Sequence, residues 1–94
     1  MKRFIILDQV KKGDMFDRVL PKGTTLGRAV GLIEKEWLLM SKYDQKRRES
    51  FCLIEQEVTE DEYGLKYDLS NYTPIIDMVM AEQIKTIRRG GKTE

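Results

Sequence analysis

The segment from residue 25 to residue 49 constrains the fold of this 94-residue chain more than any other. Its apolar residues recur at three- and four-residue spacing and form one stripe on a 3.6-residue helical period. The stripe consists of Leu26, Ala29, Val30, Ile33, Trp37 and Met40, with Leu32, Leu39 and Tyr43 on one flank. Together they cover roughly half of the circumference at about 100° per residue. A helix this broadly apolar needs cover on more than one side, so we expect a sheet and a second helix to pack against it.

The sequence allows two local structures at Ser41, inside this segment. Serine followed three residues later by Asp44 is a capping-box-like pattern, which normally begins a helix. Either one helix continues to about Arg48, at the same helical period, or the helix ends near Met40 and a short second turn follows. We favour the break, because the apolar stripe stops at Tyr43.

Gly27 and Gly31 lie on the other flank of the predicted helix. Each destabilises a helix interior by about 1 kcal/mol relative to alanine. We therefore expect the backbone of a neighbouring element to approach the helix closely at these positions.

The rest of the chain predicts an antiparallel sheet. Apolar residues at 4–10 and a return at 14–20 predict an N-terminal hairpin. Residues 50–58 form the strongest strand: the first half is apolar on both faces and the second half alternates, which is typical of a central strand that emerges toward solvent. An acidic turn at 59–64 leads to a fourth strand at 65–69.

A second helix is predicted near the end of the chain. Thr73 supplies a capping hydroxyl, and Pro74 occupies the first helical position, where no N–H is needed. The helical stripe that follows consists of Ile76, Met80, Ile84 and Ile87, and residues 90–94 form a frayed tail. The sequence thus predicts a single α+β domain over residues 1–94. Its order is β-β-α-β-β-α, with the central helix and the C-terminal helix packed on one face of a small antiparallel sheet.

The composition argues against several classes of function. The chain has no histidine, which removes the commonest general base and the commonest metal ligand. Cys52 is the only cysteine, so no internal disulfide can form. The first apolar run, residues 4–7, is too short for a signal-peptide core or a membrane span. We expect a cytoplasmic protein that is not an enzyme, has no cofactor or metal, and does not associate with membranes.

Basic residues near the end of the central helix are the first candidate site. With a net charge of only +1, nucleic-acid binding would depend on a local patch. The alternative is a solvated turn that Asp44 and Glu49 partly neutralise, and only Tyr43 is adjacent to stack on a base. The candidate contacts for nucleic acid or another partner are Lys42, Lys46, Arg47, Arg48, Arg88 and Arg89, with Lys92 nearby.

Apolar residues outside the predicted core suggest a protein interface. Leu38 falls on the polar side of the central helix, and Met78 belongs to a set that does not all fit one core. Our leading hypothesis is a non-catalytic accessory or protein-interaction domain that binds a protein partner or forms a homodimer, with a mobile element or phage-like region as its candidate origin. The second hypothesis is nucleic-acid binding through residues 42–48 and the C-terminal basic residues.

A short motif spans the end of the central helix. It consists of Glu36, Trp37, Met40, Ser41 and Asp44, followed by Arg47, Arg48 and Phe51. This region resembles a loose group of small bacterial proteins of unknown function, in which a helix ends E-W-x-x-L-T-x-x-E before a basic turn and a strand. In this chain methionine, serine and aspartate replace the leucine, threonine and second glutamate of that pattern. The resemblance implies a capped turn after the helix and a strand beyond it, and it implies no activity.

Overall fold

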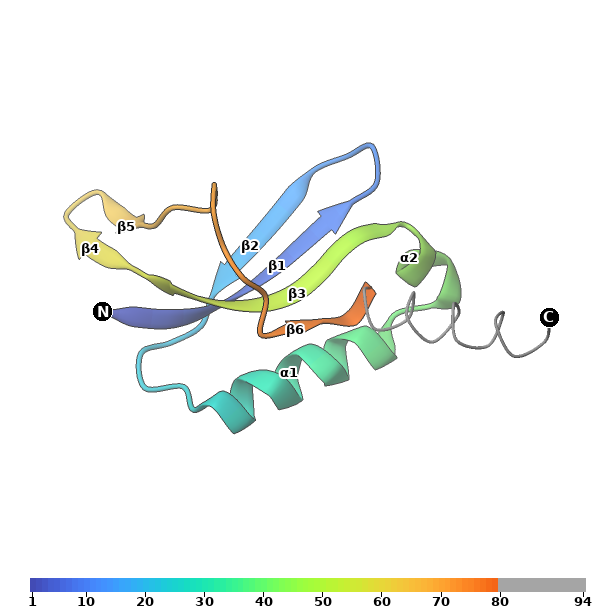
Figure 1. Cartoon of the computed structure of the whole chain (residues 1–94), viewed down its shortest axis with the longest axis horizontal. Helices are drawn as coiled ribbons and strands as arrows, with labels where there is room; N and C mark the ends of the chain where they lie inside the picture. The colour runs from blue at the N-terminus through green and yellow to red at the C-terminus, as the bar shows by residue number, and fades with distance from the viewer. Residues whose placement is uncertain (80–94) are drawn as a thin grey trace.

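The computed structural model describes residues 1–79. Within them the chain forms a small α+β fold, as predicted, with an antiparallel four-stranded sheet ordered β2-β1-β3-β6 and a separate two-stranded sheet of β4 and β5 (Figure 1). The elements are β1 (Lys2–Val10), β2 (Met15–Val19), α1 (Leu26–Leu39), α2 (Lys42–Lys46), β3 (Arg48–Glu57), β4 (Thr59–Asp61), β5 (Gly64–Lys66) and β6 (Ile76–Asp77). None of the helices in this part of the chain is long and apolar enough to cross a membrane.

Strands β1 and β3 form the centre of the sheet and are buried on both faces. Ile5 of β1 pairs with Ile54 of β3 and with Val19 of β2. Successive side chains of a strand point to opposite faces. Ile6 therefore packs on one side of the sheet, while Ile5 and Leu7 pack on the other. Burial on both faces explains why the middle of each central strand is a continuous apolar run.

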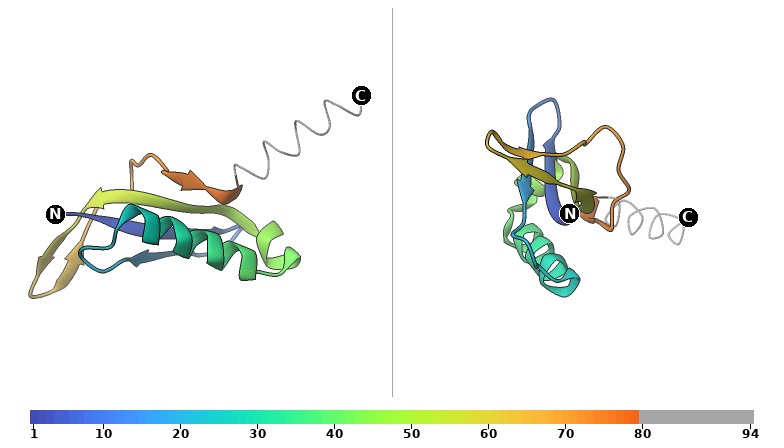
Figure 2. Two further views of the ribbon diagram at one scale, coloured as in Figure 1. Left: turned by 90° about the horizontal axis from the view of Figure 1, so that it is seen from below. Right: turned by 90° about the vertical axis from the view of Figure 1, so that its left-hand side faces the viewer.

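Helix α1 covers one face of the sheet, and the larger hydrophobic core lies beneath it (Figure 2). Trp37 is 5% exposed, and its ring lies 5.7 Å from that of Phe51, centroid to centroid, at an interplanar angle of 54°. This tilted geometry is favourable for an aromatic pair. The buried residues of this core are Ile6, Leu20, Ala29, Ile33, Trp37, Phe51 and Leu53. Trp37 is thus the main link between helix and sheet.

Among the described residues, a loop covers the opposite face of the sheet. Tyr67, Leu69 and Tyr72 pack against a second core, which consists of Ile5, Leu7, Cys52, Ile54 and Val58. The side-chain amide of Gln56 donates hydrogen bonds to the carbonyl oxygens of Asp68 and Asn71, at 2.6 and 3.2 Å. These bonds fix the loop to β3, so the sheet lies between α1 and residues 67–72 (Figure 2).

The predicted break after α1 is confirmed. Helix α1 ends with Met40 as its C-cap, whose backbone N–H donates to the carbonyl of Trp37. The hydroxyl of Ser41 then accepts a hydrogen bond from the backbone N–H of Asp44, at 3.1 Å, and begins α2. The side chain of Gln45 donates to the carbonyl of Trp37 at 2.8 Å, which holds α2 against the end of α1. The capping pattern therefore marks a real helix start.

The expectation of a close neighbour at Gly27 and Gly31 is wrong. Within residues 1–79, apart from the neighbouring residues and backbone of α1 itself, no heavy atom lies within 4 Å of the Cβ that an alanine would add at either position. Both glycines are exposed on α1, and the structure does not explain their presence.

The end of the described chain also differs from the prediction. Residues 64–66 pair with β4 as an isolated hairpin, and β3 instead pairs with β6, with Leu53 opposite Ile76. The backbone N–H of Ile75 donates to the carbonyl of Leu53 at 2.7 Å. A helix beginning at Thr73 would leave these groups of a buried strand without partners, which is energetically unfavourable. Residues 80–94, with most of the predicted helix and the frayed tail, lie outside the described residues.

Candidate interaction site

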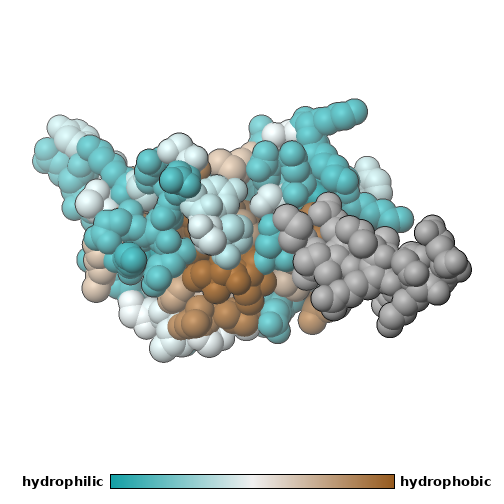
Figure 3. All heavy atoms as spheres, viewed as in Figure 1, coloured by the Kyte–Doolittle hydropathy of each residue, from teal (hydrophilic) through white to brown (hydrophobic). Residues whose placement is uncertain are grey.

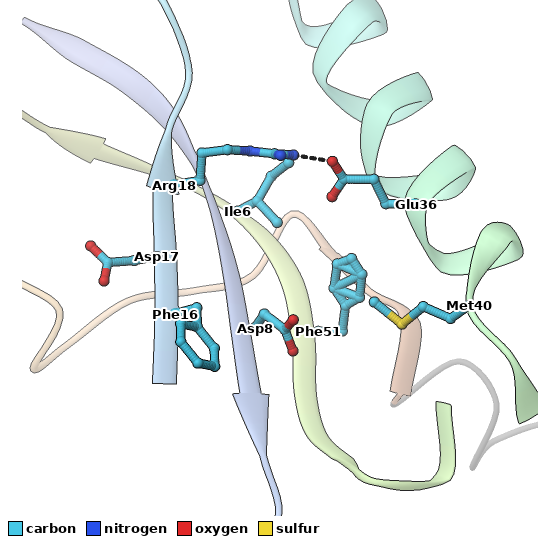
Figure 4. A pocket seen from close by; sticks show the side chains of 8 residues that line it. All are labelled: Ile6, Asp8, Phe16, Asp17, Arg18, Glu36, Met40 and Phe51. Atoms are coloured by element: carbon cyan, nitrogen blue, oxygen red, sulfur yellow. Dashed lines mark hydrogen bonds and ion pairs between the residues drawn. The ribbon is translucent and has the colours of Figure 1, made fainter. Parts of the chain in front are cut away.

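A cavity of about 230 Å³ lies between β2 and the C-terminal half of α1, on the helix-covered face of the sheet (Figure 4). Apolar side chains form one part of its lining: Ile6, Phe16, Met40 and Phe51. Polar residues form the other part: Asp8, Asp17, Arg18 and Glu36. The cavity therefore combines an apolar surface with charged groups at its margin.

Strand β2 supplies the outer wall of this cavity through its alternating side chains. Leu20, just after β2, belongs to the core under α1, so Phe16 and Arg18 point to the same face. Phe16 is 59% exposed, a large value for an aromatic residue in a sheet. The carboxylate of Asp17 points away from the cavity (Figure 4), and it accepts a hydrogen bond from the hydroxyl of Tyr67 on the opposite face.

An ion pair joins β2 to α1 at the cavity. The guanidinium of Arg18 donates to the carboxylate of Glu36 (Figure 4). Both side chains are partly exposed, and exposed ion pairs contribute only about 0–1 kcal/mol. The pair therefore orients Arg18 but binds it weakly, so Arg18 remains accessible to a further carboxylate.

A second ion pair lies deeper in the same region. Nε of Arg48 is 2.6 Å from Oδ1 of Asp8, and the side chains are 15% and 23% exposed. Both atoms are buried, and neither has an aligned hydrogen-bond partner among the described residues, so charge attraction holds the pair together. The guanidinium of Arg48 also donates to the carbonyl of Asp44 at 3.2 Å. Arg48, predicted as a nucleic-acid contact, is thus held by two contacts within the fold.

The other predicted basic residues are arranged differently. The guanidinium of Arg47 lies over the ring of Tyr43, 5.5 Å from its centroid, and the side chains of Lys42 and Lys46 are exposed. The structure therefore places three exposed cations on and beside α2, whereas the side chain of Arg48 is largely buried. Arg88, Arg89 and Lys92 lie outside the described residues.

The predicted interface residues, Leu38 and Met78, have different environments. Leu38 is 77% exposed on α1. Met78 is half-buried and packs against the core under α1, together with Ile76 and Val79. Figure 3 shows the apolar surface that lies over β6 and the adjoining side of α1. Since this surface adjoins Val79, the last described residue, its cover is not defined by residues 1–79.

The outer edge of β2 is the feature that the sequence did not reveal. The backbone N–H of Leu20 donates to the carbonyl of Phe4 at 2.8 Å. Hydrogen-bonded positions alternate along an antiparallel pair, so the backbone groups of Phe16 and Arg18 also face β1. Those of Met15, Asp17 and Val19 face outward, and within residues 1–79 no strand pairs with them. The only sequence signal was a short strand with apolar Met15 and Phe16 beside two charges.

Cys52 and the acidic residues of the described chain are the remaining groups that could react or bind a metal ion. Burial raises the pKa of the Cys52 thiol, a hydrogen bond from Ser50 opposes that rise, and the charge of Asp77 adds to it. A thiol of this kind is a poor nucleophile. In the described part of the chain, no group of three or more His, Cys, Asp or Glu side chains is placed to hold a metal ion.

Comparison with protein-family models, with curated proteins and with solved structures finds no match. The resemblance at residues 36–51 gains no support from them and stays a prediction. The edge of β2 and the cavity beside it are the structural features that bear on function.

Proposed function

We propose that this protein is a non-catalytic interaction domain that binds an extended segment of a protein partner along the outer edge of β2. One observation carries the proposal. The open edge lies directly beside the cavity, and Phe16 belongs to both.

The proposed binding mode is the addition of a strand to an existing sheet. The outward-facing N–H and C=O groups of Met15, Asp17 and Val19 would hydrogen-bond to the main chain of the incoming segment. Main-chain bonds provide affinity that depends little on sequence, and pockets for alternate side chains provide the specificity. Here the cavity would accept one apolar side chain of the segment, packed against Phe16 and Phe51.

Charges at the cavity favour a segment of mixed composition. Arg18 can pair with an acidic residue of the partner, because its pair with Glu36 is exposed and weak. On the opposite face Asp17 is already bonded to Tyr67. A segment with an apolar residue and an acidic residue on the same strand face, two residues apart, fits this surface.

A proline at Met15 tests the proposal. Since the N–H of Met15 faces away from β1, Met15→Pro removes an outward donor and leaves the β1–β2 ladder intact. Met15→Ala is the matched control, because it removes the same side chain and keeps the N–H. Peptides selected on the wild-type protein from a displayed random library provide the probe.

We expect the selected peptides to bind wild type and Met15→Ala with similar affinity and to bind Met15→Pro at least tenfold more weakly. Amide chemical shifts in the wild-type complex should change most in β2 and around the cavity. Peptides that bind Met15→Pro as well as wild type, or that map to α2, would contradict the proposal.

Nucleic-acid binding is the alternative, supported in the described part of the chain by the exposed cations at Lys42, Lys46 and Arg47. It predicts binding to RNA or DNA that weakens steeply with salt. Replacing both lysines with alanine should then reduce the slope of that salt dependence. Binding that is insensitive to salt and to these replacements would exclude this alternative.

A further inference from the structure

We propose that the segment bound at β2 is the β2 strand of a second copy of this chain, so that two four-stranded sheets join edge to edge. This inference rests on the proposed function, because it names the partner of the same edge. Its basis is the order of charged and apolar residues along β2, which matches itself in one antiparallel register.

Geometry limits the registers that such a dimer can use. The two-fold axis of an antiparallel strand pair is perpendicular to the sheet, so each face of one subunit continues as the same face of the other. Residues directly opposite each other must share a face. The axis must therefore pass through a residue, and the residues of β2 to consider are Met15, Phe16, Asp17, Arg18 and Val19.

An axis through Phe16 gives a favourable or neutral side-chain pair at each position of the strand. It places Phe16 opposite Phe16 of the partner subunit, and it places Arg18 opposite Asp14 of the partner subunit, twice by symmetry. The outward backbone groups of Met15 then meet those of Asp17 in the other subunit and can form hydrogen bonds. Asp14 and Arg18 are exposed, and the pair of Arg18 with Glu36 is exposed and weak, so Arg18 can also contact Asp14 of the partner subunit.

Two of the other four registers place like charges opposite each other within the strand. An axis through Asp17 pairs two carboxylates, and an axis through Arg18 pairs two guanidinium groups. An axis through Met15 sets Arg18 against Lys12, which lies in the turn before β2 with a φ of 58° and does not continue the strand. An axis through Val19 sets Asp17 against Pro21, which has no N–H to donate. Like charges directly opposite on a sheet are destabilising, whereas opposite charges and aromatic pairs are stabilising. Charge complementarity, together with the turn at Lys12 and the missing N–H of Pro21, thus selects the register centred on Phe16.

The same register completes the cavity. Phe16 occupies a position whose outward side is not hydrogen-bonded, where opposed side chains lie closest. Phe16 of the partner subunit would therefore lie against the exposed ring of Phe16 at the mouth of the cavity. The ring that is 59% exposed in one copy becomes buried in the pair. Because the contact involves a strand of only five residues, we expect a weak and reversible dimer.

Disulfide trapping tests the position of the axis. Two strands in this register bring the Cα atoms of residue 16 to about 4.5 Å, within the range that a disulfide can span. Phe16→Cys should form a covalent dimer under mild oxidation. Leu38→Cys is the matched control, because it places an equally accessible thiol on α1, and the native Cys52 is buried in both variants. Trapping through Leu38→Cys and not through Phe16→Cys would overturn the proposal.

Complementary charge reversals test the register. Asp14→Lys sets two cations opposite each other in its homodimer, and Arg18→Glu sets two anions opposite each other. Each variant should dimerise about tenfold more weakly than wild type, since two pairs change from attraction to repulsion. A mixture of the two variants should form a heterodimer at wild-type strength, because every cross-strand pair is then attractive. Analytical ultracentrifugation measures all three associations.

The outcomes separate this inference from the proposed function. If the mixture fails to restore association, or the single variants dimerise like wild type, the second copy is not the partner in this register. If the wild-type chain is also monomeric but selected peptides still discriminate Met15→Ala from Met15→Pro, this inference fails and the proposed function stands. If the proline has no effect on either peptides or self-association, both fail.

Discussion

Removing the guanidinium of Arg48 tests whether the basic turn is structural. Arg48→Met keeps an apolar side chain of similar length and leaves Asp8 without its partner, 2.6 Å away in the native protein. Breaking a fully buried pair destabilises by about 3–5 kcal/mol, and an exposed pair is worth about 0–1 kcal/mol. At 15% and 23% exposure this pair lies between those limits. We expect a loss of about 2 kcal/mol, part of which comes from the hydrogen bond to Asp44.

Urea unfolding of a double-mutant cycle measures this loss. Asp8→Asn should also destabilise, and the double variant should lose less than the sum of the two, with a coupling energy of about 1 kcal/mol. The melting temperature of Arg48→Met should fall by roughly 8–16 °C for a domain of this size. Arg47→Met is the control, because its side chain is exposed, and should change stability by less than about 0.5 kcal/mol. A coupling energy of zero, or an Arg48→Met protein as stable as the control, would refute the structural role. Arg48 would then be a candidate partner contact, like Lys42, Lys46 and Arg47.

Three further predictions concern the cap, the core and the second face. Ser41→Ala should lower the free energy of unfolding by about 1 kcal/mol in urea, because α2 loses its N-cap. Ile33→Ala should lower it by about 2–5 kcal/mol and Leu38→Ala by less than about 0.5 kcal/mol, since the first is fully buried and the second is exposed. The hydrogen bond to Asp17 raises the pKa of Tyr67 to about 12. The neutral hydroxyl therefore stabilises the fold below about pH 10, and this contribution should disappear as pH rises from about 10 to about 12. In Tyr67→Phe, unfolding at a series of alkaline pH values should show a flatter decline.

Local signals explain what the sequence could predict. The stripe of α1 and the cap at Ser41 depend on residues three or four apart, and the structure confirms both. The apolar runs of β1 and β3 also mark burial on two faces. The local pattern of the sequence was thus sufficient to predict the fold class and the central helix.

Non-local pairing explains the errors near the end of the described chain. Thr73 and Pro74 favour a helix start, but β3 has an edge that needs hydrogen-bond partners, and Ile76 supplies them instead. The second face of the sheet is covered because Gln56 holds residues 67–72 against it. No periodic pattern in the sequence links these two segments. Sequence periodicity carries no information on either choice.

The candidate site shows the same division. The cations of residues 42–48 were visible as a cluster in the sequence, but Arg48 finds its partner in Asp8, on a strand far away in the chain. Phe16 and Met15 looked like ordinary residues of a weak strand. Only the sheet order places them at an open edge beside a cavity.

Charges on an edge strand normally protect it from pairing with other chains. Strand β2 carries Asp17 and Arg18 and is flanked by Asp14, so these charges protect its edge from pairing with most other strands. Protection alone, however, would make every self-register unfavourable, and the register centred on Phe16 brings Arg18 and Asp14 together twice. The charges of Asp17 and Arg18 disfavour the registers centred on those residues, and Arg18 favours this one, so specificity is obtained through repulsion and attraction together. An exposed aromatic ring at the centre of that register, next to a cavity on its own face, favours a selective contact over simple protection of the edge.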